Sequence, residues 1–137
     1  MNIIWLKRDL RLSDHSPLNK CEKLNKNYSF IYIFEPSIIN YPDTSLRHLQ
    51  FIYHSLQVMN KKLVKYNRQV SIYYGEADEV FINLIKNNNI EGIYSYQESG
   101  IPITYERDLK LKKIFKNNKI LWNEYQRDGI IRGIKNR

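Results

Sequence analysis

The amino-acid sequence predicts an α/β protein in which a five-stranded parallel, doubly wound sheet carries helices on both faces. Five short apolar runs alternate along the chain with longer stretches whose apolar residues recur at helical spacing. Strands that alternate with helices pair in parallel, because each connecting helix returns the chain to the same edge of the sheet. Since such crossovers are right-handed, few topologies remain.

The first predicted strand is followed by a charged loop and a helix. Residues 2–6 (NIIWL) form a nearly continuous apolar run, which is typical of a strand buried on both faces. Residues 7–14 are mostly charged and predict a loop. Ser13 or Asp14 can cap a helix that runs to about Lys26. Its apolar face comprises Leu18, Cys21 and Leu24.

A second strand and a long helix come next. Residues 28–34 (YSFIYIF) predict the strand, and the helix begins at Thr44 or Ser45 and ends near Tyr66. The helix is indicated by apolar residues at helical spacing, namely Leu46, Leu49, Ile52, Tyr53, Leu56, Met59 and Leu63.

The remainder of the chain predicts three strands and two helices. The strands are residues 69–74, 90–96 and 120–122, and the helices are residues 76–87 and 105–117. In doubly wound folds, ligands bind at the carboxyl ends of the strands. The loops that follow the first, second and fourth strands are therefore the candidate ligand-binding segments.

Length and composition limit the classes of protein that fit. The 137 residues suit one domain, since domains run to about 100–200 residues. The 22 Lys and Arg residues exceed the 14 Asp and Glu residues, which gives a net charge of +8 that is compatible with an anionic partner. The sequence has a single cysteine, and it has neither a secretory signal nor an apolar run as long as the roughly 20 residues of a membrane span. We therefore expect a cytoplasmic protein without a membrane partner.

Several common chemistries lack their motifs. There is neither a G-x-G-x-x-G loop nor a G-x-x-x-x-G-K-[ST] loop, which argues against an ordinary NAD or P-loop site. The three histidines lack the spacing of metal ligands, and no G-x-S-x-G elbow is present. Cys21 lies on an apolar helix face and is predicted to be a buried hydrophobic residue, so we expect neither a metal site nor a nucleophile.

An ordered set of motifs runs through the chain. Its first member, W-L-K-R-D-L-R-L-S-D, closes the first predicted strand. The others are Phe34-Glu35-Pro36; Arg47, Phe51, Ser55-Leu56 and Leu63; Gly75-Glu76; Gln97-Glu98-Ser99-Gly100 with Thr104 to Asp108; and Trp122 to Tyr125 with Gly129 to Arg132. Together they resemble the N-terminal α/β domain of the DNA photolyase and cryptochrome family over nearly the whole chain.

The resemblance implies the strand order 3-2-1-4-5. It also implies an α/β domain at residues 1–125 and the start of an interdomain linker at residues 126–137. In this family a separate helical domain holds FAD and receives the pyrimidine dimer of UV-damaged DNA, and we expect that domain to be absent from this chain. The parent protein would repair DNA by light-driven electron transfer or sense blue light, whereas this domain alone is expected to catalyse nothing.

The resemblance further implies a light-harvesting antenna chromophore, either methenyltetrahydrofolate, a deazaflavin or FMN. Glu98 is the principal candidate, because a carboxylate accepts hydrogen bonds from an N–H-rich ring edge. Tyr32 can pack on the face of the ring. The full set of residues carried over from the family comprises Arg8, Asp9, Tyr32, Glu35, Arg47, Gln97 and Glu98.

Structural roles are the alternatives for the candidates in the loops. Arg8 and Asp9 can pair with each other and fix the first loop. Gln97 and Glu98 can cap the helix that follows them.

The arginines of two predicted helices also have structural alternatives. Arg47 can pair with Glu35 or Asp43. Arg107 and Asp108 indicate a structural pair or a contact between domains.

Two other functions stay open at this point. One is a nucleotide-binding or signalling module with a similar fold, and the other is a docking domain that has lost its antenna.

Overall fold

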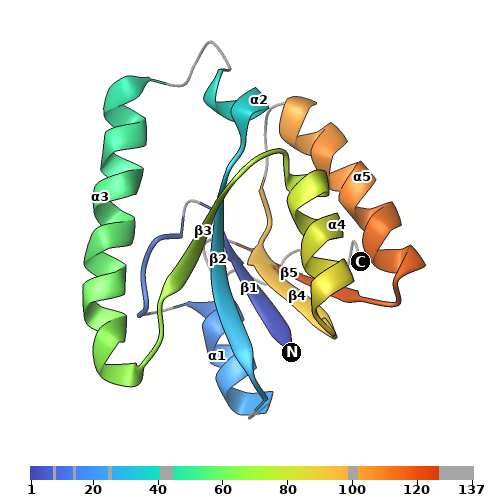
Figure 1. Ribbon diagram of the computed structural model, residues 1–137, viewed down its shortest axis with the longest axis horizontal. Coiled ribbons are helices and arrows are strands. Elements are labelled where there is room, and N and C mark those ends of the chain that lie inside the picture. Colours follow the sequence, from blue (N-terminus) through green and yellow to red (C-terminus); the bar gives the residue numbers. More distant parts are fainter. Residues whose placement is uncertain (8, 14, 25, 41–44, 99–101, 127–137) are drawn as a thin grey trace.

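The computed structural model describes residues 1–126 apart from residues 8, 14, 25, 41–44 and 99–101. All five strands are parallel and form one sheet in the order β3-β2-β1-β4-β5 (Figure 1), which confirms the predicted fold class and strand order. The predicted linker, residues 126–137, lies outside the described residues except for its first residue. The strands are β1 (Asn2–Leu6), β2 (Tyr28–Phe34), β3 (Val70–Tyr74), β4 (Gly92–Tyr96) and β5 (Leu121–Tyr125).

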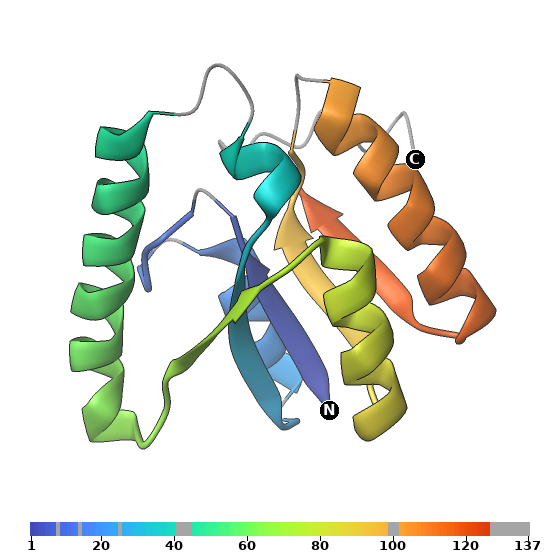
Figure 2. The same cartoon turned by 45° about the horizontal axis from the view of Figure 1, so that its top comes forward.

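The helices cover both faces of the sheet. Figures 1 and 2 show α1 and α3 on one side and α4 and α5 on the other. None of the described helices is long and apolar enough to cross a membrane. The helical elements are α1 (Ser16–Leu24), α2 (Pro36–Ile39), α3 (Leu46–Leu63), the 3-10 turn η1 (Val64–Tyr66), α4 (Ala77–Asn87) and α5 (Pro102–Asn117). The short helix α2 is absent from the sequence prediction, and α5 begins three residues earlier than the prediction.

Alternate residues of the central strand enter two separate cores. Ile4 and Leu6 pack in the core beneath α1 and α3, whereas Ile3 and Trp5 pack in the core beneath α4 and α5. All four side chains are at most 1% exposed. The prediction of a strand buried on both faces is therefore confirmed, as expected for a parallel sheet that is covered on both sides.

The apolar face predicted for α3 is only partly buried. The buried residues of this helix are Ile52, Leu56, Met59 and Leu63. Leu46 and Tyr53, which helped to indicate the helix, are 71% and 57% exposed. The reason is that the buried residues lie in the later turns, and the first turns of α3 do not pack on the sheet.

The cap of α1 is a histidine rather than a serine or an aspartate. His15 is fully buried, and its Nδ1 atom accepts the backbone N–H of Leu18 at 3.1 Å. This bond satisfies one of the free amides of the first helical turn. Ser13 lies three residues before the start of α1, and Asp14 lies outside the described residues.

Candidate functional site

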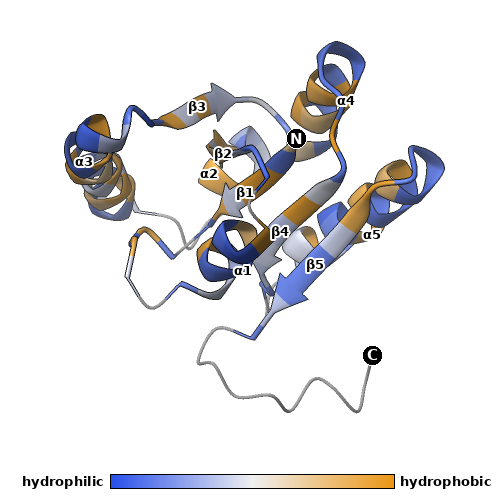
Figure 3. Ribbon diagram, turned by 90° about the horizontal axis from the view of Figure 1, so that it is seen from below, coloured by the Kyte–Doolittle hydropathy of each residue, from blue (hydrophilic) through white to orange (hydrophobic). Residues whose placement is uncertain are grey.

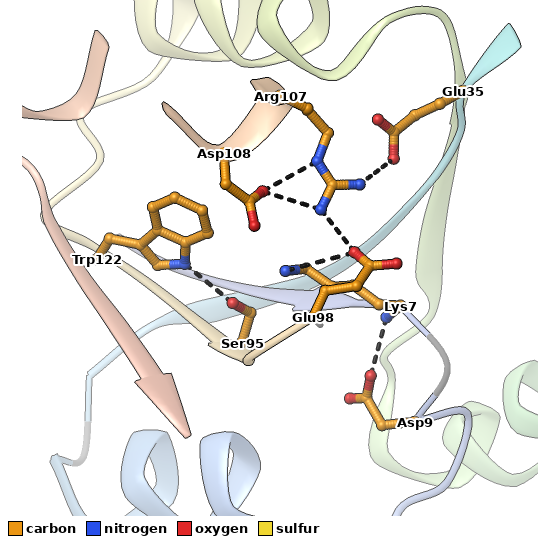
Figure 4. A network of polar contacts seen from close by, with 8 residues as sticks. All are labelled: Lys7, Asp9, Glu35, Ser95, Glu98, Arg107, Asp108 and Trp122. Atoms are coloured by element: carbon orange, nitrogen blue, oxygen red, sulfur yellow. Dashed lines mark hydrogen bonds and ion pairs between the residues drawn. The ribbon is translucent and has the colours of Figure 1, made fainter. Parts of the chain in front are cut away.

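The carboxyl ends of β1, β2 and β4 lie side by side, and a charged residue follows each of them. The strand order reverses between β1 and β4, and the crevice outside such a reversal is where doubly wound folds bind ligands. Lys7 follows β1, Glu35 follows β2, and Glu98 comes two residues after β4. Helix α5 starts at this edge and adds Arg107 and Asp108 (Figure 4). We call these five residues the charged cluster.

Arg107 is the centre of the charged cluster. Its Nη1 atom donates to Glu35 at 3.0 Å, and its Nη2 atom donates to Glu98 at 2.6 Å. Its Nε and Nη2 atoms also donate to Asp108 Oδ1 at 3.0 and 2.9 Å. The guanidinium carbon lies 4.9 Å from the centre of the Trp5 ring. A planar guanidinium presents five donors in a fixed fork, which suits it to hold several carboxylates at once.

Lys7 lies beneath Glu98 and is nearly as buried as the core. Its Nζ atom is 3.7 Å from Glu98 Oε1 and 4.3 Å from the centre of the Trp5 ring. Among the side chains of the described residues, Lys7 Nζ is the buried polar atom that lacks a hydrogen-bond partner. Burial lowers the pKa of Lys7, and the charge of Glu98 offsets part of this effect. The ammonium group thus has capacity for another acceptor.

The charged cluster contains three carboxylates and two cations, and burial governs its protonation. Burial raises the pKa of Glu35 to about 7, against the opposing effect of Arg107. Burial lowers the pKa of Arg107, but the three neighbouring carboxylates outweigh it and raise that pKa above its ordinary value. Within the part of the chain that the structure describes, no group of His, Cys, Asp and Glu side chains is arranged to hold a metal ion.

Asp9 fixes the loop that follows β1. One carboxylate oxygen accepts the backbone N–H of Lys7 at 2.9 Å, and the other bonds to Nε2 of His15. Since the Nδ1 atom of His15 accepts the N–H that caps α1, Nε2 carries the ring proton and donates it to Asp9. Burial would raise the pKa of Asp9, but the hydrogen bonds from His15 and from the backbone N–H of Lys7 lower it overall. Tyr96 packs edge-on against His15 at 5.1 Å.

The other residues predicted for the site lie around the charged cluster rather than in it. Tyr32 is buried in the core beneath α1 and α3 and packs edge-on against Phe34 at 4.9 Å. Arg47 is exposed in the first turn of α3. Gln97 is exposed beside β5, where its side-chain oxygen accepts from Gln126 at 3.1 Å. Arg8 lies outside the described residues.

The ion-pair partner of Glu35 differs from the one expected. The sequence suggested Arg47, whereas the structure pairs Glu35 with Arg107, which lies 72 residues away. Arg107 is a residue that the sequence prediction left out of the ligand site. Lys7 lies in a candidate loop but was not singled out as a site residue. The position of Arg107 near the start of the helix after the fourth strand was a signal for it. A helix that follows a parallel strand begins at the carboxyl edge of the sheet, so its first turns bring polar side chains to the crevice.

Comparison with known proteins places the chain in a family. Residues 2–131 match the DNA photolyase family, and the chain belongs to it. It is 26% identical over 110 residues to Cryptochrome-1 of Erithacus rubecula, and the match covers 80% of this chain and 18% of that protein. It is 28% identical over 120 residues to the deoxyribodipyrimidine photo-lyase of Buchnera aphidicola, and the match covers 82% of this chain and 24% of that protein. The chain thus spans about a fifth to a quarter of these relatives and corresponds to the N-terminal domain of a photolyase or cryptochrome.

Solved structures show the same fold. The photolyase of Sulfolobus tokodaii was described with two FAD molecules, with the implication of a novel light-harvesting cofactor. It has a TM-score of 0.81 and 29% identity, and the match covers 92% of this chain and 29% of that protein. The Synechocystis cryptochrome has a TM-score of 0.80 at 22% identity, and covers 90% of this chain and 26% of that protein. Family membership favours the photolyase or cryptochrome prediction over the alternative of a nucleotide-binding or signalling module that only shares the fold.

Proposed function

We propose that this domain binds an antenna chromophore at the carboxyl edge of its sheet. The observation that carries the proposal is the buried charged cluster. It stands where the strand order reverses, and its side chains come from the segments that follow β1, β2 and β4 and from α5. The description of the related Sulfolobus tokodaii photolyase with a light-harvesting cofactor supports it.

Glu98 is the residue that we propose to contact the chromophore most directly. Its side chain is 13% exposed, more than those of the buried Lys7 and Arg107 that hold it. Its carboxylate can accept hydrogen bonds from the N–H groups of a pteridine or flavin ring. The same N–H donors would lower the pKa of Glu35 from its value of about 7, because a hydrogen bond to the ionised form of a carboxyl group favours that form.

The remaining candidates would frame the ligand. Asp9 holds the first loop in place. Arg8, its neighbour in the sequence, lies outside the described residues. Arg47 and Gln97 offer exposed polar groups on α3 and beside β5. Tyr32 is largely covered by the core, so we propose a packing role for its ring at the base of the site.

The proposal leaves three chromophores to be distinguished: methenyltetrahydrofolate, a deazaflavin and a flavin nucleotide such as FMN. We further propose that the parent protein adds a helical domain that binds FAD, to which the antenna passes its excitation energy. Such a protein would repair UV-damaged DNA or act as a blue-light receptor, and this domain would contribute light harvesting rather than catalysis.

We also propose a cytoplasmic location for the protein. The single cysteine, Cys21, is a buried free thiol whose pKa burial raises to about 12. An unpaired thiol suits a reducing compartment.

The experiment is to incubate the chain with each chromophore in turn, remove the free ligand and record the near-ultraviolet and blue absorption of the protein. We expect one chromophore to be retained, and Glu98→Gln to weaken its binding about tenfold or more, since a hydrogen bond to a charged group contributes about 1.5–3 kcal/mol. The matched control is Glu91→Gln, because Glu91 precedes β4 at the opposite edge and is 49% exposed. Absence of all three chromophores from the wild-type chain would favour a docking domain without an antenna.

A further inference from the structure

Strand β3 leaves one edge of the sheet apolar and uncovered. Among the described strands it pairs only with β2, at the end of the sheet (Figure 3). Ile72 and Tyr74 of this strand are 42% and 73% exposed. Edge strands are usually protected from pairing with another chain by charged residues or proline. The sequence of β3, VSIYY, contains neither, whereas β5 at the other edge carries Glu124.

The backbone of β3 directs hydrogen-bonding groups to this free edge. The N–H of Gly75 donates to the carbonyl oxygen at the end of β2 at 3.0 Å, so the odd-numbered residues of the segment bond to β2. The even-numbered residues face the opposite way, and the N–H of Val70 donates to the side chain of Asn60 in α3 at 2.7 Å. The N–H and C=O groups of Ile72 and Tyr74 therefore point away from the sheet, where another strand can pair with them.

Helix α3 adds exposed apolar side chains beside the same edge. Leu46, Tyr53 and Val64 are 71%, 57% and 72% exposed. At about 100° per residue, all three lie within about 40° of Asn60 on the helical circle, and the side chain of Asn60 reaches the free edge at Val70. These side chains therefore face past the sheet rather than onto it. We call the exposed apolar set the β3 surface; it comprises Leu46, Tyr53, Val64, Ile72 and Tyr74.

Charges of opposite sign lie at the two ends of β3. Residues 61–68, which precede the strand, include four basic residues and no acidic one. Residues 76–79, which follow it, include three acidic residues and no basic one. An antiparallel copy of β3 would set the basic end of each strand beside the acidic end of the other, whereas a parallel copy would set like charges side by side. The charges thus favour antiparallel pairing of this strand with itself.

We propose that β3 pairs with β3 of a second copy of this chain, about a two-fold axis at Ile72. The two copies of Ile72 then exchange both of their backbone hydrogen bonds. The N–H of Tyr74 in each copy donates to the carbonyl oxygen of Val70 in the other. These four hydrogen bonds leave the bond between Val70 and Asn60 intact. Because a two-fold contact of this kind is closed, it yields a dimer rather than a chain of copies.

The same axis also brings the exposed residues of α3 together. Figure 1 shows that α3 runs antiparallel to β3, and the bond between Asn60 and Val70 fixes their relative position. Ile72 lies about 6.6 Å beyond Val70, which corresponds to about four residues of α3 before Asn60. This point is near the middle of the segment between Leu46 and Val64. Leu46 of one copy therefore lies near Val64 of the other, and the strand contact and the helix contact share one axis.

The β3 surface is separate from the charged cluster. Strand β2 lies between β3 and β1, and the charged cluster stands on the far side of β2, between β1 and β4 and beneath α5. The dimer contact goes beyond the proposed antenna function and does not depend on it, and it is tested without any chromophore.

The first test is sedimentation velocity of the full chain at concentrations from about 1 μM to about 1 mM. We expect a transition from monomer to dimer within this range, since one strand edge and one helix face form a small interface of the weak class, below about 1,200 Å². Ile72→Lys sets two like charges at the axis and should raise the dissociation constant at least tenfold. The matched control is Leu121→Lys, which changes a residue that is 72% exposed on β5 and should leave the dissociation constant unchanged.

The second test is oxidative cross-linking, which reports the direction and the register of the pairing. In Ile72→Cys the two new thiols lie opposite each other with Cα atoms about 5.5 Å apart, inside the range of about 4.4–6.8 Å that a disulfide requires. In Tyr74→Cys they lie four residues apart along the strands, or about 13 Å, which is too far. We expect a disulfide-linked dimer from the first variant alone. Cys21 is buried and does not compete.

Three results would each overturn the proposal. The first is a wild-type chain that stays monomeric over the whole concentration range. The second is a dimer that Ile72→Lys and Leu121→Lys weaken equally, and the third is cross-linking of Tyr74→Cys as efficient as that of Ile72→Cys. All three substituted positions are exposed, so the variants should fold, and circular dichroism spectra verify this.

Discussion

Arg107 offers the sharpest test of how the candidate site is held together. Replacing it with methionine keeps most of the volume of the side chain but removes four hydrogen bonds to three carboxylates. Lys7 then faces all three carboxylates alone. Breaking a buried ion pair by removing one partner costs about 3–5 kcal/mol, because the other charge stays buried without compensation. We expect Arg107→Met to lower the free energy of unfolding by that amount at about pH 8, measured by urea unfolding with tryptophan fluorescence.

The loss should depend on pH with a defined sign. Arg107 lowers the pKa of Glu35, so its removal raises that pKa further above the value of the unfolded chain. A carboxyl group with a raised pKa costs stability when it is ionised, and the cost disappears as pH falls through the folded-state pKa. At about pH 5 we therefore expect the loss to be smaller by about 1–2 kcal/mol, since one pKa unit corresponds to about 1.4 kcal/mol.

A second arginine provides the control for this experiment. Arg68 donates to the carbonyl oxygen of Tyr28 at 2.9 Å and stacks on its ring at 3.9 Å, and the structure gives it no carboxylate partner among the described residues. Arg68→Met should cost about 1 kcal/mol without a pH dependence, as expected for one hydrogen bond. The reasoning is refuted if Arg107→Met costs no more than Arg68→Met, or if its cost is the same at both pH values. Adding Glu35→Gln to Arg107→Met should restore part of the loss.

Three further outcomes follow from individual side chains. The pKa of Glu35 is raised from 4.5 to about 7, so the wild type loses stability as the pH rises from 4.5 to 7. Over the same pH range, the stability of Glu35→Gln relative to the wild type should rise by about 2–3 kcal/mol in thermal melts. His15→Ala should cost about 3 kcal/mol or more in urea unfolding, since it leaves Asp9 unpaired and α1 uncapped, and His15→Asn should cost less because it keeps an acceptor for the cap. Cys21 should resist a thiol reagent in the folded protein and react once urea unfolds the chain; fast labelling in native buffer would contradict its burial.

Local patterns were sufficient to predict most of the sheet. The second strand was predicted at Tyr28–Phe34 and lies there. A continuous apolar run is typical of a parallel strand that is covered on both faces, and the polar residues around the run mark the ends of the strand. The fifth strand was predicted to end at Trp122 but continues to Tyr125. An edge strand is paired on one side only and accepts polar residues such as Asn123 and Glu124, so its end has no hydrophobic signal.

The site could be predicted as a location but not as a set of contacts. The topology alone indicated the carboxyl edge, where Glu35 and Glu98 do lie together. The choice of Arg107 as their common partner depends on how α5 packs against the sheet, which sequence spacing does not encode. The histidine cap of α1 was missed for a related reason, because a histidine serves as a cap only when a neighbour such as Asp9 fixes its tautomer.

The central claim is that a chromophore binds at the carboxyl edge of the sheet, and NMR mapping tests it most directly. Each of the three chromophores is titrated into the isotope-labelled chain, and the backbone amide shifts are followed at every assigned residue. We predict that one chromophore shifts the amides of Lys7, Glu35, Glu98 and Arg107 and leaves those around Glu91, at the opposite edge, in place. Shifts confined to any other surface, or no shifts with all three chromophores, would contradict the account.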